Sequence, residues 1–155
     1  MISPEVLRRF PFFGWIEAED LRAIAMISEE VPIEKDTTIF EECASADSLY
    51  FLISGSVDLF FSVRAETGPA GQKEYYSGSI NPGEAFGVSA LIDPYRYTTT
   101  ARASAPVQAL RVDAIALRQL LENKPRLGVR LMGQIARLAM ERLNAARVQL
   151  AAAWS

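Results

Sequence analysis

The spacing of apolar residues predicts helices at both ends of the chain and short strands between them. Val6, Leu7 and Phe10 follow Ser3-Pro4, a pair typical of a helix N-terminus, and this first helix should end at Pro11. A second helix is expected over residues 17–28, because acidic residues fill its first turn and apolar residues then recur at helical spacing. Residues 1–30 are therefore expected to be helical.

From Val31 the pattern changes to short apolar runs separated by turn residues. The expected strands are residues 31–33, 37–40, 49–53, 56–64, 72–80, 98–103 and 107–112. Residues 54–56, 66–71 and 81–84 are rich in Gly, Pro, Ser and Asn and are predicted to be turns. No ten-residue helical pattern separates these runs. A parallel α/β sheet is therefore disfavoured, and seven or eight antiparallel strands over residues 31–113 point to a sandwich or roll.

Helical spacing returns in residues 114–155. Asp113 is a good N-cap for a helix that should end before Pro125, and residues 126–153 lack proline and predict one long helix. Two apolar stripes follow this helix: Leu127, Leu131, Ile135 and Leu138, then Ala139, Leu143, Ala146, Leu150 and Ala153. The first stripe can pack on the roll. The second predicts a partner helix and hence a homodimer, and a frayed tail on its own domain is the alternative.

Composition narrows the chemistry. The chain has 155 residues, 50% of them hydrophobic, which suits one domain spanning residues 1–155. It contains no histidine, and Cys43 is its single cysteine. Histidine-dependent triads, zinc sites of the HExxH type, disulfide frameworks and iron–sulfur sites are thereby excluded. We expect neither an enzyme nor a metal site.

The start of the chain lacks the basic and apolar regions of a signal peptide, and Asp58 interrupts the longest apolar stretch. We therefore expect a cytoplasmic protein without a membrane span. Net charge is −3, but from residue 102 onward nine arginine and lysine residues stand against three acids. A solvated basic helix explains this distribution, and a nucleic-acid-binding tail is the alternative.

Specific residues now fit one family. The run Asp47-Ser48-Leu49-Tyr50-Phe51-Leu52-Ile53-Ser54-Gly55-Ser56-Val57, followed by Gly83-Glu84-Ala85-Phe86-Gly87, resembles the cyclic nucleotide-binding domain of the catabolite activator/FNR-like regulators. Phe10-Pro11-Phe12-Phe13, Ile39-Phe40, Leu120-Leu121 and Pro125 agree with it in order and separation. The resemblance implies a mainly β fold: an eight-stranded antiparallel β-roll of the double-stranded jelly-roll type, with N-terminal helices and a long C-terminal helix.

The resemblance also implies a phosphate-binding cassette at residues 86–100. In the family, a glutamate binds the ribose hydroxyl, the amides of a short helix face the phosphate, and an arginine neutralises it. The expected ligand is a cyclic nucleotide such as cyclic AMP, or another small anion, and no other cofactor is expected. The candidate ligand-binding residues are Phe86, Gly87, Val88, Ser89, Ala90, Leu91, Arg96, Tyr97, Thr98, Thr99 and Arg142.

Both polar anchors of the cassette are replaced. Val88 stands at the glutamate position and Tyr97 at the arginine position, while Arg96 comes one residue early. The two missing contacts together cost about 2.5–6 kcal/mol, or roughly 10² to 10⁴ in affinity. We therefore expect a degenerate cassette. Two turn glycines of the family pattern are also replaced, by Asp36 and Cys43.

Several candidates have structural explanations that stay open. Arg96 can be a surface loop arginine, and Thr98 and Thr99 can be strand residues. Ser89 is the expected N-cap of the cassette helix. Arg142, at a base-reading position of the family, can stack on a base or simply be solvated. Cys43 as a redox sensor has little support, because two glutamates precede it.

Two functions remain. The first is a stand-alone sensor domain that signals through its long C-terminal helix. The second is a ligand-free homodimeric module that binds a protein partner and retains the fold. No helix-turn-helix follows the long helix before Ser155, so we expect no sequence-specific nucleic-acid binding from this chain.

Overall fold

The structure is a computed structural model that describes residues 1–64 and 71–155. It forms two compact units, residues 1–119 and residues 120–155, which are described in turn. The first unit holds the N-terminal helices and all strands. The second holds the end of one helix and the long C-terminal helix. A single domain over residues 1–155 stays a prediction.

The N-terminal helices begin as expected, but the helical region ends early. They are α1 (Pro4–Arg8), the 3₁₀ helix η1 (Pro11–Phe13) and α2 (Ala18–Met26). The hydroxyl of Ser3 accepts a hydrogen bond from the amide of Glu5, which confirms it as the cap of α1. Strand β1 (Ser28–Ile33) starts where helix was expected. Ser28 donates its hydroxyl to the Ile24 carbonyl at the end of α2 (2.6 Å), while its backbone pairs with β8.

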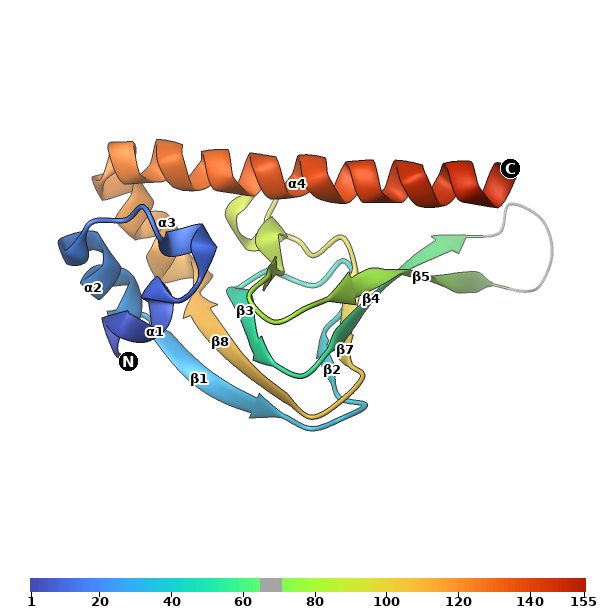
Figure 1. The fold of residues 1–155 in the computed structure, drawn as a ribbon, viewed down its shortest axis with the longest axis horizontal. Coiled ribbons are helices and arrows are strands. Elements are labelled where there is room, and N and C mark those ends of the chain that lie inside the picture. Colours follow the sequence, from blue (N-terminus) through green and yellow to red (C-terminus); the bar gives the residue numbers. More distant parts are fainter. Residues whose placement is uncertain (65–70) are drawn as a thin grey trace. The chain divides into compact units, whose positions relative to one another are not determined.

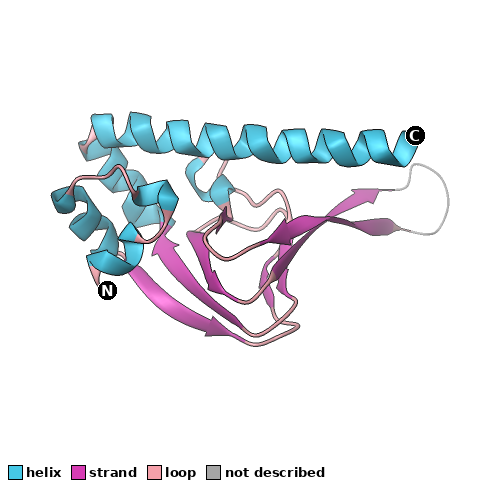
Figure 2. Cartoon of the chain, in the orientation of Figure 1, coloured by secondary structure: helices cyan, strands magenta, loops and turns pink. Residues whose placement is uncertain are grey.

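In the part of the chain that the structure describes, eight antiparallel strands form two four-stranded sheets, which confirms the expected β-roll (Figures 1 and 2). One sheet has the order β1-β8-β3-β6, and the other β2-β7-β4-β5. The remaining strands are β2 (Thr38–Phe40), β3 (Ser48–Ser54), β4 (Val57–Arg64), β5 (Gln72–Ile80), β6 (Ala85–Phe86), β7 (Thr100–Ala103) and β8 (Val107–Asp113). Strand β6 was missed in the sequence because two residues are too few to show alternation.

Strand β7 begins two residues later than predicted. The backbone of Tyr97 bonds to the loop before β3 instead: its amide donates to the Ala44 carbonyl, and its carbonyl accepts from the Cys43 amide. The turn at residues 54–56 is confirmed by Gly55, whose φ of +97° and contact with Pro106 leave no room for a Cβ. The turn predicted at residues 66–71 lies, apart from Gly71, outside the described residues.

Phenylalanines join the N-terminal helices to the roll. The Phe51 ring of β3 is fully buried and lies 4.7 Å from the Phe13 ring and 5.3 Å from the Phe10 ring, centroid to centroid. Burying each such side chain contributes about 1.5–3 kcal/mol. In Figure 1, α1 and α2 lie beside β1 and β8, which agrees with these contacts. This packing fixes the sheet from which the cassette starts.

The C-terminal helices match the sequence-based expectation. Asp113 caps α3 (Ala114–Asn123) by accepting from the amides of Ile115 and Ala116, and α4 (Pro125–Trp154) is one helix of 30 residues. Within the second unit, a Cβ on Gly128 would come 3.3 Å from the Leu121 carbonyl oxygen, so α4 starts close against the end of α3.

The two stripes of α4 differ in exposure. In the first stripe, Leu127, Leu131 and Ile135 are buried. In the second, the outer stripe of Ala139, Leu143, Ala146, Leu150 and Ala153, every residue is exposed. Among the described residues, no helix is both long and apolar enough to cross a membrane.

Candidate functional site

The cassette segment, residues 86–100, leaves the sheet at the end of β6. Phe86 pairs with Tyr50 of β3, and Gly87 then adopts a left-handed conformation with φ +72°. A Cβ at this position would lie 3.3 Å from the rings of Phe40, Tyr50 and Tyr97. Glycine is therefore required here both for its conformation and for the close approach of these rings.

A short 3₁₀ helix follows, η2 (Val88–Leu91). The prediction that Ser89 caps this helix is wrong: Gly87 is the cap residue, it makes no side-chain cap bond, and Ser89 lies inside η2. Gly87 can take the left-handed turn at the start of the helix, which a serine would resist. Ala90 and Leu91 are buried, whereas Val88 and Ser89 are half-buried.

Tyr97 lies in an aromatic cluster with Phe40, Tyr50 and Phe86. Its ring stacks on Phe40 with 3.8 Å between centroids and 13° between planes, and it is only 5% exposed. Phe40 and Phe86 also stack on Tyr50, at 5.9 and 5.1 Å. At the position that counting along the sequence assigns to the family's arginine, this chain therefore has a packed aromatic ring.

The hydroxyl of Tyr97 is also fully engaged. It donates to the Ser48 carbonyl (2.7 Å) and accepts from the Ser48 amide (3.3 Å). Burial raises the pKa of Tyr97 to about 12, and the bond to Ser48 opposes this increase. The tyrosine thus ties the cassette segment to the first residue of β3 as a neutral group.

Arg96 does not join Tyr97. Its side chain is exposed, and its Nη1 donates to the Cys43 carbonyl at 3.0 Å. Arg96 also forms an isolated β-bridge with Ser45. Thr98 is exposed and Thr99 half-buried, and both precede β7, so the interpretation of these two threonines as strand residues is wrong. The backbone bonds of Tyr97 to Cys43 and Ala44 delay the strand.

Asp36 and Cys43 both occupy the left-handed conformation expected of the glycines they replace, with φ of 69° and 71°. The Asp36 amide donates to the Ala103 carbonyl, and the Cys43 amide donates to the Tyr97 carbonyl, each at 2.8 Å. These turns are therefore kept without glycine. Holding an L-residue there costs roughly 1–2 kcal/mol, and less for aspartate.

Arg118 and Tyr95 were missed in the sequence. Arg118 of α3 donates from Nη1 to the Ala90 carbonyl at 2.9 Å, and its guanidinium lies 4.0 Å from the centre of the Tyr95 ring. Nothing in the helical spacing of α3 separates Arg118 from a solvated arginine. To predict the contacts of Arg118 from the sequence, one would have had to know that η2 ends beside α3.

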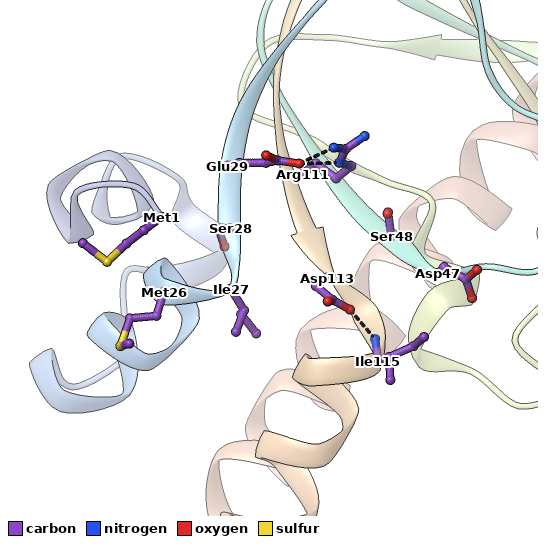
Figure 3. Close-up of a pocket in the computed structure, with 10 residues that line it drawn as sticks. All are labelled: Met1, Met26, Ile27, Ser28, Glu29, Asp47, Ser48, Arg111, Asp113 and Ile115. Carbon is purple, nitrogen blue, oxygen red and sulfur yellow. Dashed lines mark hydrogen bonds and ion pairs between the residues drawn. The ribbon is translucent and has the colours of Figure 1, made fainter.

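Apart from the cassette segment, a cavity of about 610 Å³ lies in the first unit, on β1, β3 and β8 (Figure 3). Three charged side chains that line this cavity already make structural contacts within the fold. Glu29 pairs with Arg111, and Asp113 caps α3. None of the candidate ligand-binding residues lines it. The cavity is thus separate from the cassette.

Arg142 lies in the second unit, on α4, where it is half-buried. It takes part in an interaction, so it is not a freely solvated side chain. Its neighbour Leu143 is 50% exposed and belongs to the outer stripe. No hydroxyl stands at these two positions.

Comparison with known proteins gives consistent results. The family profile of the cyclic nucleotide-binding domain matches residues 30–124. A CRP-like cAMP-activated global transcriptional regulator of Mycobacterium tuberculosis is 27% identical over 133 residues, which cover 86% of this chain and 57% of the regulator. The chain thus spans little more than half the length of this curated relative.

Two solved structures extend the likeness. A Geobacter metallireducens protein provisionally described as cyclic nucleotide-binding is 40% identical, with a TM-score of 0.81 over 92% of this chain and 99% of that one. The sensor domain of the transcriptional regulator DNR from Pseudomonas aeruginosa is 26% identical, with a TM-score of 0.67 over 90% of each chain. With the β-roll, the cassette position and the long C-terminal helix in place, the chain belongs to the cyclic nucleotide-binding domain family and is related to the CRP-like regulators.

Proposed function

We propose that this chain is a regulatory domain whose cassette is degenerate at the phosphate end and which signals through its long C-terminal helix. The observation that carries the proposal is the burial of Tyr97 in the aromatic cluster. An anion placed against Tyr97 would meet a neutral ring and a hydroxyl already bonded to Ser48. The family's charge-assisted contact has no counterpart at this position.

The other cassette groups do not replace that contact. Arg96 is engaged with the Cys43 carbonyl, and Val88 offers no acceptor for a ribose hydroxyl. The proposed ligand-binding set therefore consists of the backbone amides from Ser89 to Leu91, of which the Ala90 amide also donates to the Gly87 carbonyl, and of the hydroxyls of Ser89, Thr98 and Thr99. Neutral donors alone hold a phosphate less tightly than a set that includes an arginine, by about 1.5–3 kcal/mol.

A second candidate function is a ligand-free homodimeric module that binds a protein partner. The exposed outer stripe of α4 favours it, because Leu143 and Leu150 are 50% and 51% exposed on a helix with apolar heptad spacing. Both candidates are non-enzymatic and use the same helix. They differ in whether a small ligand changes the behaviour of that helix.

Neither candidate function includes sequence-specific DNA binding. Five of the nine basic residues from residue 102 onward lie on α4, the helix that we expect to pair, and the other four are spread over β7, β8, α3 and the residue before α4. We therefore propose a protein that acts in the cytoplasm through protein contacts. A footprint of the purified chain on a defined DNA site would contradict this part of the proposal.

Calorimetric titration of the purified chain with cyclic AMP, cyclic GMP and cyclic dinucleotides tests the proposal. Cyclic AMP should bind about 10² to 10⁴ times more weakly than it binds an intact cassette. Arg96→Ala should leave any residual binding unchanged if Arg96 stays on Cys43. Binding of cyclic AMP by the unmodified chain at low micromolar concentration would contradict the degenerate cassette.

A double substitution that should restore binding gives a second test of the degenerate cassette. Val88→Glu with Tyr97→Arg restores both anchors and should tighten cyclic AMP binding at least tenfold, since the two anchors together contribute roughly 10² to 10⁴ in affinity. Because the arginine would replace a packed ring, circular dichroism must first show that the variant is folded. Val88→Glu alone is the matched control and should give the smaller gain.

A further inference from the structure

The contacts of Arg118 join two parts of the fold that are distant in sequence. Arg118 lies on α3, while Ala90 and Tyr95 lie on the cassette segment, and all three belong to the first unit. Its Nη1 donates to the Ala90 carbonyl at 2.9 Å, and its guanidinium carbon stands 4.0 Å from the Tyr95 ring centroid. One edge and one face of the same guanidinium group are therefore used together.

The Ala90 carbonyl lies in the second half of η2, where a cation is favourably placed. Ala90 is fully buried. If its carbonyl lost the hydrogen bond from Arg118, bulk water could not replace that bond unless the cassette segment opened. Stacking on Tyr95 adds a second contact to the same guanidinium. These contacts hold the cassette from the side of α3.

Tyr95 is held from the other side as well. It adopts a left-handed conformation with φ +58°, and its carbonyl accepts from the Ala46 amide at 2.7 Å. A tyrosine in that conformation is strained, and the ring contact with Arg118 and the backbone bond with Ala46 keep it in place. The cassette is thus fixed between the loop before β3 and α3.

The helix that carries Arg118 leads directly into α4. The Lys124 amide donates to the Leu120 carbonyl, and the Gly128 amide donates to the Lys124 carbonyl, each at 3.0 Å. Backbone hydrogen bonding therefore continues from the last turn of α3, past Pro125, into the first turn of α4.

We propose that Arg118 is a positioning residue that couples the cassette segment to α3. This inference rests on the proposed regulatory function, because a signalling domain needs a link from its cassette to its C-terminal helices. Only arginine can supply it, since its planar guanidinium stacks with one face and donates with its edge. A lysine ammonium cannot do both.

Hydrogen–deuterium exchange of the full chain tests the coupling. Arg118→Lys, which keeps the charge, should raise exchange at least tenfold both in residues 88–97 and in residues 114–123. Peptides from β1 and β8 should be unchanged. Arg22→Met, which removes an exposed arginine from α2, is the control and should alter neither region.

The reciprocal variant separates coupling from a local structural role. Tyr95→Leu removes the stacking partner at the cassette end only, and it should raise exchange in residues 114–123. The double variant should add less than the sum of the two single effects. The proposal is overturned if Arg118→Lys exchanges like the unmodified chain, if Tyr95→Leu affects only the cassette, or if exchange rises uniformly in β1 and β8. The readout involves no nucleotide, so tight cyclic AMP binding would overturn the proposed function without deciding this result.

Discussion

The aromatic cluster beside the cassette and the outer stripe of α4 are both rich in apolar side chains, but only the cluster is covered. Tyr97 and Phe40 are 5% and 8% exposed, and the Tyr97 hydroxyl has its partners on Ser48. Leu143 and Leu150 are about half exposed. The cluster is covered within one chain, whereas the stripe is the surface at which we propose that a partner helix packs.

This difference separates two parts of the family's function that usually occur together. In the function that we propose, aromatic packing around Tyr97 takes the place of the polar anchors at the ligand end. The helix end keeps its apolar spacing, which a monomer does not need.

The largest expected effect comes from emptying the cluster. Tyr97→Ala removes a buried ring and two hydrogen bonds, and should lower the free energy of unfolding by about 3–5 kcal/mol. Urea denaturation measures this. The control Tyr76→Ala removes a tyrosine that is 57% exposed and should cost under about 1 kcal/mol. Equal losses for both variants would mean that the cluster is not closed.

The next effect concerns the stripe. Leu143→Asp would place an unpaired charge in each helix of a dimer and should weaken self-association at least tenfold, without reducing monomer stability. Light scattering at micromolar concentration gives the mass. Asn144→Asp adds the same charge one position away and should leave the dimer intact. A monomer mass for the unmodified chain would refute the pairing.

Raising the pH tests the burial of the Tyr97 hydroxyl without changing the volume of the aromatic cluster. In the unfolded chain Tyr97 should ionise near pH 10, but in the folded chain its pKa is about 12. The unfolded state therefore loses its proton first, and the free energy of unfolding should fall by about 2 kcal/mol as pH rises from 10 to 12. Tyr97→Phe should lack this part of the fall. Identical pH profiles would show that the hydroxyl is not buried.

The smallest expected effect compares two glycines of α4. Gly133→Ala meets nothing within 4 Å and should stabilise the helix by about 0.5–1 kcal/mol. Gly128→Ala would crowd the Leu121 carbonyl, so its stability should fall below that of Gly133→Ala by about 1 kcal/mol. Thermal unfolding followed by circular dichroism decides the order. If Gly128→Ala were more stable than Gly133→Ala, the close contact between the start of α4 and the end of α3 would be contradicted.

The fold could be predicted because its signals are local. Alternation of apolar and polar residues predicts strands such as β4 and β8, Asp113 predicts the start of α3, and the absence of proline after Pro125 predicts α4. Strand β6 and the late start of β7 could not, because both depend on pairing partners far away in sequence.

The candidate site shows the same limit. Counting along the sequence placed Tyr97 at the arginine position, but its stacking on Phe40 joins residues 57 apart, which spacing cannot reveal. The capping role of Ser89 was wrong because Gly87 offers a conformation that serine resists. The side chain of Arg118 was overlooked since an arginine on a helix is usually solvated.

Cys43 offers a practical consequence of the turn in which it stands. It is the single thiol of the chain, it is exposed, and its backbone bonds to both Arg96 and Tyr97. A maleimide dye would therefore attach at one position, next to the cassette, without any engineered substitution. Its emission would report movement of that loop when candidate ligands or partner proteins are added, so the natural chain already carries the attachment point for its own screening assay.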